Sequence, residues 1–401
     1  MDGRKLRIAH IAPPWFAIPP RDYGGTENVI STLTEGLVQR GHAVTLFATG
    51  DSITSANLWY IWSKDLISMQ VPWTDSSKAK KHIQDAFQYA IRENKNGVAG
   101  SRYNFDIIHV HLSSAADIFL FELASLSPIP IVATLHSRFP FDRRENHIGE
   151  DDAFYLKWAH SLPLIAISQY AKKDALQHVI EKISFAGVIP HGLNSLNFDQ
   201  GEKKDRDILT WIGRVTPDKG THHALEVAVK LKQKIIFAGI IDKFLSSSQD
   251  YYLKKIKPLM DAYPEYITYI GKVNRIEKAK LLQRSLVFLN PIVWEEPFGL
   301  VVIEAMAQGC PVISFKRGAM AEIIKPGING DFAKDTDEMA QKVLPVIQNI
   351  DRNKLVQWTK DNYSDGKMIL EYEKTYQEVI ASFHKNASFK TIQTEQTLKI
   401  A

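Results

Sequence analysis

The sequence predicts an α/β protein of two domains, each built on a parallel sheet with helices on both faces. Short apolar runs alternate with helical segments along the whole chain, a pattern typical of parallel strands covered on both sides. The series of strands restarts after a polar stretch near the middle, and 401 residues are enough for two cores. We therefore expect two Rossmann-like domains whose sheets face a central cleft.

The first domain is predicted over residues 1–195. A helix should occupy Thr26–Arg40 and end at Gly41, and Ser168 is well placed to cap a later helix. The strands of this domain are expected near residues 6–12, 43–48, 106–111, 130–135, 162–167 and 185–189.

The second domain is predicted over residues 196–365, with the polar residues 197–207 as the linker. Gly-x-Gly-x-x-Gly is absent from both domains, which argues against a dinucleotide cofactor. Strands are expected near residues 208–213, 235–239, 267–271, 286–290 and 311–315. A last helix-like stretch near Lys367–His384 precedes a polar tail, residues 386–401, that we expect to be poorly ordered.

The composition is that of a soluble enzyme. Apolar residues make up 45% and charged residues 23% of the chain. A net charge of +4 is too weak to argue for a nucleic-acid partner. The single cysteine, Cys310, excludes an internal disulfide framework and reads as a buried small side chain. The first apolar run is ended by Pro13 and Pro14, so we expect a cytoplasmic protein without a targeting signal.

Residues 51–105 read as a long insertion in the first domain. Trp59, Trp62 and Trp73 lie near Lys78, Lys80 and Lys81 in this segment. Such a mixture can contact lipid headgroups or a glycolipid, which leaves peripheral contact with the inner face of the membrane open. We favour the alternative that the tryptophans pack in the core beneath a solvated lysine face.

Residues 291–318 carry the strongest chemical signal. Glu296 and Glu304 are separated by seven residues, the first in a strand-to-helix loop and the second about two turns into the helix. That helix should begin near Phe298 and Gly299, so its unpaired N–H groups face the loop. A carboxylate beside an anion-binding helix end suits a ligand with both phosphate and sugar hydroxyls, such as a nucleotide sugar.

Glu296 to Ile313 reads Glu-Pro-Phe-Gly-Leu-x3-Glu-Ala-Met-Ala-x-Gly-x-Pro-Val-Ile and resembles the Glu-x7-Glu signature of glycosyltransferase family 4. These are retaining enzymes of the GT-B fold that use nucleotide-sugar donors. The resemblance implies that Glu304 binds the ribose, that Glu296 holds sugar hydroxyls, and that Phe298, Gly299 and Leu300 contribute backbone amides. It also implies that the last helix crosses back to the first domain.

The first strand of the second domain is followed by Gly213-Arg214-Val215-Thr216-Pro217-Asp218-Lys219-Gly220. Thr216 can cap the next turn and Pro217 suits its first position. Arg214 and Lys219 would then form a clamp for a diphosphate, and the string resembles the family's diphosphate-binding Gly-Arg-x3-Pro-x-Lys-Gly. Two solvated charges in a loop are the competing interpretation.

A glycine loop, Tyr23-Gly24-Gly25-Thr26-Glu27, lies between the first strand and the first helix. Gly24 and Gly25 allow the backbone to approach a ligand closely. In the family this loop touches the diphosphate or the acceptor, whereas a plain turn without a ligand is the alternative.

Three histidines are candidates for the cleft. His109 and His111 point to one face of a strand, but no third ligand for a metal suggests itself. His111 is expected on the acceptor side of the cleft wall. His136 ends the next strand and resembles the family histidine that contacts the donor sugar, with a purely structural role as the alternative.

No metal and no cofactor are expected. Asp205-Arg206-Asp207 matches the Asp-x-Asp element of metal-dependent glycosyltransferases, but it precedes a strand and so lies opposite the cleft. In the loop after residue 315, Glu322 is expected to cap or pair locally.

The resemblance implies a metal-independent, retaining enzyme. It would transfer a hexosyl unit from a nucleoside-diphosphate sugar to a saccharide or glycolipid in polysaccharide or glycoconjugate biosynthesis. A GT-B epimerase or phosphorylase and a non-catalytic nucleotide-sugar-binding protein remain alternatives.

Overall fold

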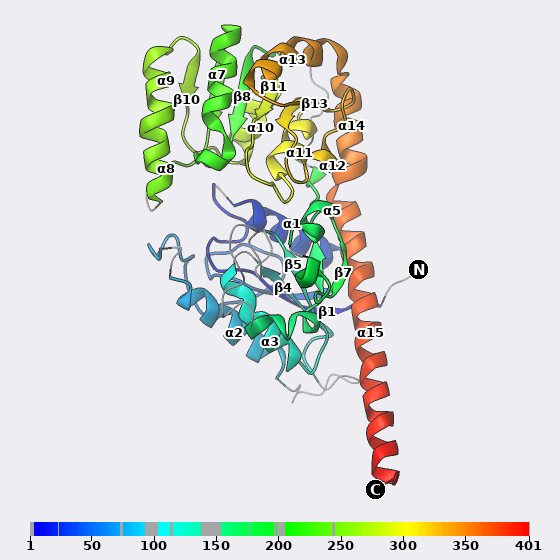
Figure 1. Cartoon of the computed structure of the whole chain (residues 1–401). Helices are drawn as coiled ribbons and strands as arrows, with labels where there is room; N and C mark the ends of the chain where they lie inside the picture. Colours follow the sequence, from blue (N-terminus) through cyan, green and yellow to red (C-terminus); the bar gives the residue numbers. More distant parts are fainter. Residues whose placement is uncertain are drawn as a thin grey trace.

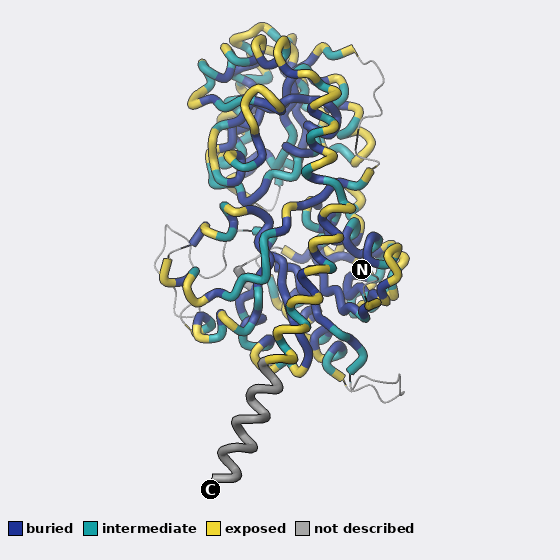
Figure 2. The backbone as a smooth tube through the Cα atoms, turned by 90° about the vertical axis from the view of Figure 1, so that its right-hand side faces the viewer, coloured by how far each residue is buried: buried dark blue, intermediate teal, exposed yellow. Residues whose placement is uncertain are grey.

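The computed structural model has two α/β domains, one above the other, and confirms the GT-B architecture (Figure 1). The structure describes residues 4–22, 24–72, 75–92, 103–112, 115–137, 154–175, 177–195, 198, 205–242 and 245–400, except the side chains of 115–116 and 386–400. Tyr23, Trp73 and most of the predicted linker lie outside this part of the chain. Buried residues follow the strands inside each domain, and exposed residues gather on the outer helices (Figure 2).

The first sheet has seven parallel strands in the order β3-β2-β1-β4-β5-β6-β7. All six strands expected in this domain are present, and β3 was missed. The strands are β1 (Arg7–Ile11), β2 (Ala43–Phe47), β3 (Asn57–Trp59), β4 (Ile107–Leu112), β5 (Ile131–Leu135), β6 (Leu164–Ala166) and β7 (Phe185–Val188).

The helices of this domain follow the expected start and stop signals. The Oγ atom of Ser168 accepts a hydrogen bond from the Ala171 N–H at 2.8 Å, so the predicted cap is confirmed. The described helices are α1 (Gly25–Gln39), α2 (Ser77–Ala90), η1 (Ala115–Phe119), α3 (Leu120–Ser125), η2 (Ala159–Ser161), α5 (Gln169–Lys173) and α6 (Gln177–Ile180).

The segment read as an insertion is built into the first domain instead. Within it, β3 forms the edge of the sheet, and α2 packs on that domain with Ile83 and Phe87 in its core. The Trp59 ring lies 5.1 Å from the ring of Phe47. Lys78 lies over the Trp62 ring at 4.8 Å, and Lys80 is exposed. The preferred interpretation, packed tryptophans below a solvated lysine face, fits these contacts.

The second sheet has six parallel strands in the order β10-β9-β8-β11-β12-β13. The five expected strands are present, and β13 is additional. The strands are β8 (Ile208–Ile212), β9 (Ile235–Ala238), β10 (Ile267–Tyr269), β11 (Ser285–Asn290), β12 (Val312–Phe315) and β13 (Gly330–Ala333). The helical elements are η4 (Pro217–Lys219), α7 (Thr221–Leu231), α8 (Ser246–Tyr251), the π-helical η5 (Tyr252–Ile256), α9 (Lys257–Ala262), α10 (Arg275–Gln283), α11 (Leu300–Ala307), α12 (Met320–Ile323), α13 (Thr336–Asn349) and α14 (Arg352–Tyr363).

The last helix, α15 (Asp365–Ile400), starts at the second domain and runs along the first (Figure 1). It continues to Ile400 rather than ending at His384. It lies so close to α1 that a Cβ atom on Gly36 would come 2.1 Å from Cδ1 of Ile369. Tyr372 and Tyr376 of α15 are fully buried against the first sheet.

Two polar contacts join the domains beside the cleft. Ser168 donates its hydroxyl to the Pro297 carbonyl at 2.7 Å. The Glu322 carboxylate accepts the backbone N–H groups of Gln169, at 2.8 Å, and Tyr170, at 2.5 Å. Glu322 thus caps α5 of the other domain, and the expectation of a local contact was wrong because the partner is about 150 residues away in the chain.

Replacing Tyr376 with phenylalanine should lower the free energy of unfolding by about 1 kcal/mol, measured by urea denaturation. The Tyr376 hydroxyl lies 2.7 Å from Nδ1 of His109 in the buried core, so its loss leaves that nitrogen without a partner. Tyr363→Phe is the control, because no hydrogen bond of the Tyr363 hydroxyl is found within the described residues. Equal losses for both variants would contradict the expectation.

Among the described residues, no helix is both long and apolar enough to cross a membrane.

Candidate functional site

A cleft between the domains brings together most of the predicted donor-binding residues. The ends of β8, β9 and β11 form the floor of this cleft, and the glycine loop before α1 forms one of its walls. Parallel strands of such sheets present their ligands at these carboxyl ends. The predicted residues that line the cleft are Gly24, Gly25, Gly213, Arg214, Lys219, Glu296, Gly299, Leu300 and Glu304.

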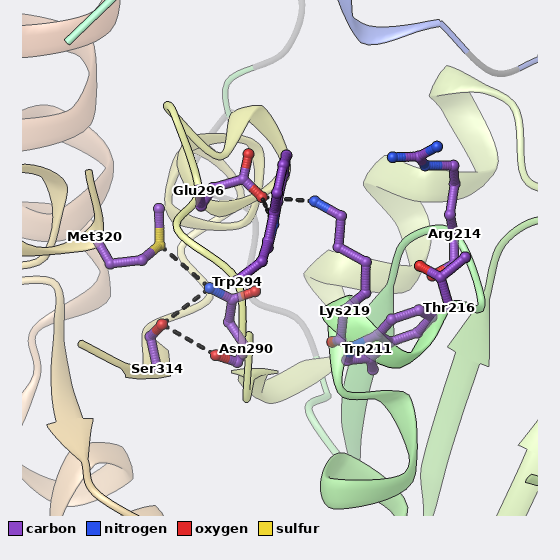
Figure 3. A network of polar contacts seen from close by, with 9 residues as sticks. All are labelled: Trp211, Arg214, Thr216, Lys219, Asn290, Trp294, Glu296, Ser314 and Met320. Carbon is purple, nitrogen blue, oxygen red and sulfur yellow. Dashed lines mark hydrogen bonds and ion pairs between the residues drawn. The ribbon is translucent and has the colours of Figure 1, made fainter. Parts of the chain in front are cut away.

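Arg214 brings an uncompensated positive charge into this cleft. Among the described residues, none forms an ion pair or a hydrogen bond with its guanidinium, and its Nε atom is buried without a partner. Figure 3 shows the side chain extended on its own beside Lys219. A half-buried guanidinium without an anion is costly, so the geometry points to an anionic ligand.

Lys219 and Glu296 form an ion pair in the cleft. The Lys219 Nζ atom lies 2.6 Å from Oε2 of Glu296, and both side chains are less than one-fifth exposed. Trp294 supports the pair, because its indole N–H donates to the same oxygen at 3.1 Å and the Lys219 ammonium lies 4.6 Å from the centroid of its ring (Figure 3). The Glu296 carboxylate is therefore held in place through Oε2, and its Oε1 atom has no hydrogen-bond partner among the described residues.

Glu304 is paired in a similar way. It is the fifth residue of α11 and so lies about one turn into the helix, not two. Its Oε1 atom accepts a hydrogen bond from Nζ of Lys278 in α10 at 2.5 Å. Lys278 lines the cleft as well, although no sequence pattern had singled it out.

Two helix N-termini face the cleft from opposite sides. Gly24 precedes α1 and Gly299 precedes α11, and neither helix has a side-chain cap. The uncapped N–H groups can bind an anion. Gly24 has a φ of +152°, and a Cβ atom there would meet Pro20 at 2.8 Å, so only glycine fits this turn.

Gly239 packs against Gly213 at the bottom of the cleft. A Cβ atom on Gly239 would come 1.6 Å from the Gly213 carbonyl oxygen. The ends of β8 and β9 can approach this closely only without a side chain. This contact explains the glycine directly after β9, whereas a Cβ atom on Gly213 would meet the Trp211 ring at 3.1 Å.

The turn that carries Lys219 differs in one detail from the prediction. Pro217 occupies the first position of η4, as expected, but the Thr216 side chain caps nothing. Its hydroxyl instead lies 3.5 Å from the carbonyl of Arg214. The following helix, α7, begins after Gly220, which adopts the left-handed conformation.

The remaining predicted residues lie behind the cleft lining. His111 is fully buried and contacts His136, whose Nε2 atom lies 2.7 Å from Nδ1 of His111. His111 therefore lies behind the cleft lining, where it can orient its neighbour His136. The Phe298 ring is 3% exposed and packs on His191 at 4.8 Å between ring centroids.

His191 is a candidate that the sequence analysis missed. It follows β7, its ring stacks on His136 at 5.1 Å, and its Nδ1 atom is buried without a partner in the described residues. Its position just after a strand, at the carboxyl edge of the sheet, was the signal that could have found it.

Three clustered histidines are spaced as metal ligands could be, and the sequence did not reveal the third. His10 lies beside His109 across β1 and β4, and with His111 they bring ring nitrogens within 4.8 Å of one another. Every ring nitrogen of the three already has a hydrogen-bond partner. This saturation does not fit a metal site, because a metal would need one free lone pair from each ring.

Asp207 and Cys310 do not line the cleft, and their contacts serve the fold. Asp207 pairs with Arg284 at 2.8 Å at the amino end of β8, away from the cleft. Cys310 is fully buried, and burial raises the pKa of its thiol to about 11, so it is not a reactive nucleophile.

The two halves of the chain match two glycosyltransferase family models. Residues 23–195 match the model described as Glycosyltransferase Family 4. Residues 194–364 match the model described as Glycosyl transferases group 1. The two matches meet where the chain passes between the domains.

Relatives and solved structures of similar proteins span nearly the whole chain. An uncharacterized glycosyltransferase of Methanocaldococcus jannaschii is 25% identical, over 84% of this chain and 89% of its own length. A phosphatidyl-myo-inositol mannosyltransferase of Mycobacterium leprae is 23% identical, over 86% of this chain and 88% of its own length. The sucrose-phosphate synthase of Thermosynechococcus elongatus superposes with a TM-score of 0.72 at 18% identity, over 94% of this chain and all of its own.

The Anabaena protein HepE in complex with UDP and glucose superposes with a TM-score of 0.66 at 16% identity, over 93% of this chain and all of its own. At such identities the structural likeness establishes the fold alone. Combined with the two family matches, it identifies the chain as a glycosyltransferase of the GT-B fold and of the family 4 type.

Proposed function

We propose that the protein is a retaining, metal-independent glycosyltransferase that moves a hexosyl unit from a nucleoside-diphosphate sugar to a saccharide or glycolipid. The observation that carries this proposal is the Arg214 guanidinium beside Lys219, at the carboxyl ends of the strands, which has no partner within the part of the chain that the structure describes. The Anabaena protein of the same fold binds UDP together with glucose, which supports a donor of this class.

The diphosphate would lie between the two helix N-termini. Arg214 and Lys219 supply cations from one side, and the N–H groups after Gly299 supply hydrogen-bond donors. Negative charge grows on the diphosphate as the glycosidic bond breaks. Donors already aimed at that position stabilise the transition state more than the ground state.

The two carboxylates would bind hydroxyl groups. Glu304, one turn into α11, would accept the ribose hydroxyls, and Glu296 would accept sugar hydroxyls near the reacting carbon. The ion pairs with Lys219 and Lys278 hold both carboxylates in place before the donor arrives. No second carboxylate is needed if the leaving phosphate takes the acceptor proton.

The acceptor would approach from the first domain, toward the histidines behind the glycine loop. With a saccharide or glycolipid as its acceptor, the enzyme would act in the biosynthesis of a polysaccharide or a glycoconjugate. The product should keep the anomeric configuration of the donor, and an inverted product would contradict the retaining assignment. A protein that binds nucleotide sugars but transfers to no acceptor would favour the binding-protein alternative.

We expect UDP to bind with the same affinity in the presence and absence of a chelator. The cationic groups of the cleft can neutralise the diphosphate without a divalent ion, and the Asp-x-Asp string lies elsewhere. Titration calorimetry of the full chain with UDP, with and without EDTA, measures this directly. Loss of binding with EDTA would show that the clamp needs a metal.

A further inference from the structure

The donor loop, residues 295–298, is anchored by the first domain. Ser168, at the N-terminal end of α5, is 3% exposed and donates its hydroxyl to the Pro297 carbonyl at 2.7 Å. The same oxygen accepts the Ala171 N–H at 2.8 Å, which fixes the direction in which the hydroxyl points. Pro297 directly follows Glu296 in the chain. This bond therefore restrains the backbone beside a carboxylate that lines the cleft.

The turn before α12 holds the donor loop from the side of the second domain. The Ala319 N–H donates to the Glu296 carbonyl at 2.8 Å. Gly318, one residue earlier, donates its N–H to Oε2 of Glu295 at 2.6 Å. A Cβ atom on Gly318 would come 2.2 Å from the Glu296 carbonyl oxygen, so the two segments pack too closely for a side chain. The donor loop and α12 thus form one packed unit.

This unit also holds the first turn of α5, which lies just below α12 in Figure 1. Glu322 of α12 accepts the N–H groups of Gln169 and Tyr170. With Ser168 on the Ala171 N–H, the first three N–H groups of α5 all have acceptors. A helix of five residues gains little stability from its own hydrogen bonds. The end of α5 and the unit of donor loop and α12 therefore stabilise each other across the domain boundary.

Two of the four residues of the donor loop are held by the first domain and two by the second. Pro297 accepts the Ser168 hydroxyl, and the Phe298 ring packs on His191. The other two residues bond to the turn before α12. The backbone that carries the Glu296 carboxylate is thus fixed from both sides of the cleft.

We propose that Ser168 and Glu322 are positioning residues that hold the donor loop so that the Glu296 carboxylate meets the donor sugar in the reactive geometry. The donor site of the second domain is then complete only while the first domain is docked on it. This inference rests on the proposed function for its effect on turnover, whereas the position of the loop is a property of the free protein. A small displacement of a group beside the reacting carbon lowers the rate, because the reacting atoms must be closely aligned.

The indole N–H of Trp294 reports the position of Glu296, because it donates to Oε2 of that residue. The test records ¹H–¹⁵N correlation spectra of the full chain, labelled with ¹⁵N-tryptophan and free of ligand, and assigns the signal with Trp294→Phe. In Ser168→Ala the Trp294 signal should shift, since the donor loop loses its hydrogen bond from the first domain. The Trp62 signal should stay in place, because that indole bonds to the backbone of α2.

Two variants of Glu322 and one control make the test specific. Glu322→Ala removes both bonds to α5 and should shift the Trp294 signal, whereas Glu322→Gln keeps an acceptor oxygen and should shift it less. Ser285→Ala is the matched control, because it also removes a buried hydroxyl, but at the amino end of β11, opposite the cleft. Its Trp294 signal should match the wild type. A wild-type Trp294 signal in Ser168→Ala or in Glu322→Ala would overturn the proposal.

In turnover of the nucleotide sugar, Ser168→Ala should lower kcat about 2- to 10-fold, the effect of one neutral hydrogen bond, and leave the affinity for UDP unchanged. UDP lacks the sugar that Glu296 would hold, so only the complete donor is affected by the displaced loop. Ser285→Ala should keep the wild-type kcat, and an equal loss in both variants would contradict a positioning role. A protein that transfers to no acceptor would refute the proposed function, whereas the Trp294 signal would still decide whether the first domain positions Glu296.

Discussion

Arg214→Ala is expected to lower kcat by a factor on the order of 10²–10³, the range for removing one donor to a developing anion. The Arg214 guanidinium has no partner among the described residues in the free protein, so its alanine variant leaves no protein group uncompensated. Its charge matters most as the diphosphate leaves. Turnover should therefore fall more than the affinity for the donor, measured as kcat against the dissociation constant of the nucleotide sugar.

Arg284→Ala is the matched control. It removes the same charge from the same domain, but Arg284 pairs with Asp207 at the amino end of the strands, opposite the cleft. This variant should keep the wild-type kcat. Arg214→Lys should retain part of the activity, because an ammonium keeps the charge but not the planar fork. A normal rate for Arg214→Ala would show that the residue is only a solvated charge.

The strands were predictable because parallel strands buried on both faces read as short apolar runs. Each of the eleven runs selected from the sequence became a strand. The edge strand β3 (Asn57–Trp59) was missed because it lies in the segment, residues 51–105, that was read as an insertion. Its neighbour α2 was missed together with it, since the segment was treated as an insertion.

The donor side of the site was predictable for a related reason. The rule that ligands meet the carboxyl ends of parallel strands needs only the strand positions, and it selected Arg214, Lys219 and Glu296. Pairings between distant parts of the chain were not predictable. His10 meets His111 only because β1 and β4 are neighbours, and Glu322 caps a helix of the other domain. Such contacts depend on strand order and domain packing, which local patterns do not contain.

Glu304→Ala is expected to weaken donor binding on the order of 10²-fold with a smaller effect on kcat. One carboxylate can accept both hydroxyls of a ribose, and each charged hydrogen bond contributes roughly 1.5–3 kcal/mol. Ribose contacts are nearly the same in the ground state and the transition state, so their loss appears in affinity rather than in rate. Calorimetry with UDP and with the nucleotide sugar should give similar losses.

The Lys278 pair makes this prediction sharper. Removing Glu304 leaves the Lys278 ammonium without its partner at 2.5 Å, and this free charge could itself attract the diphosphate and mask part of the loss. The double variant Lys278→Ala with Glu304→Ala removes both charges and closes a double-mutant cycle. If Glu304 binds the ribose directly, the loss of affinity persists when Lys278 is already alanine. If Glu304 only neutralises Lys278, Glu304→Ala should have no effect in that background, and the ribose assignment would be wrong.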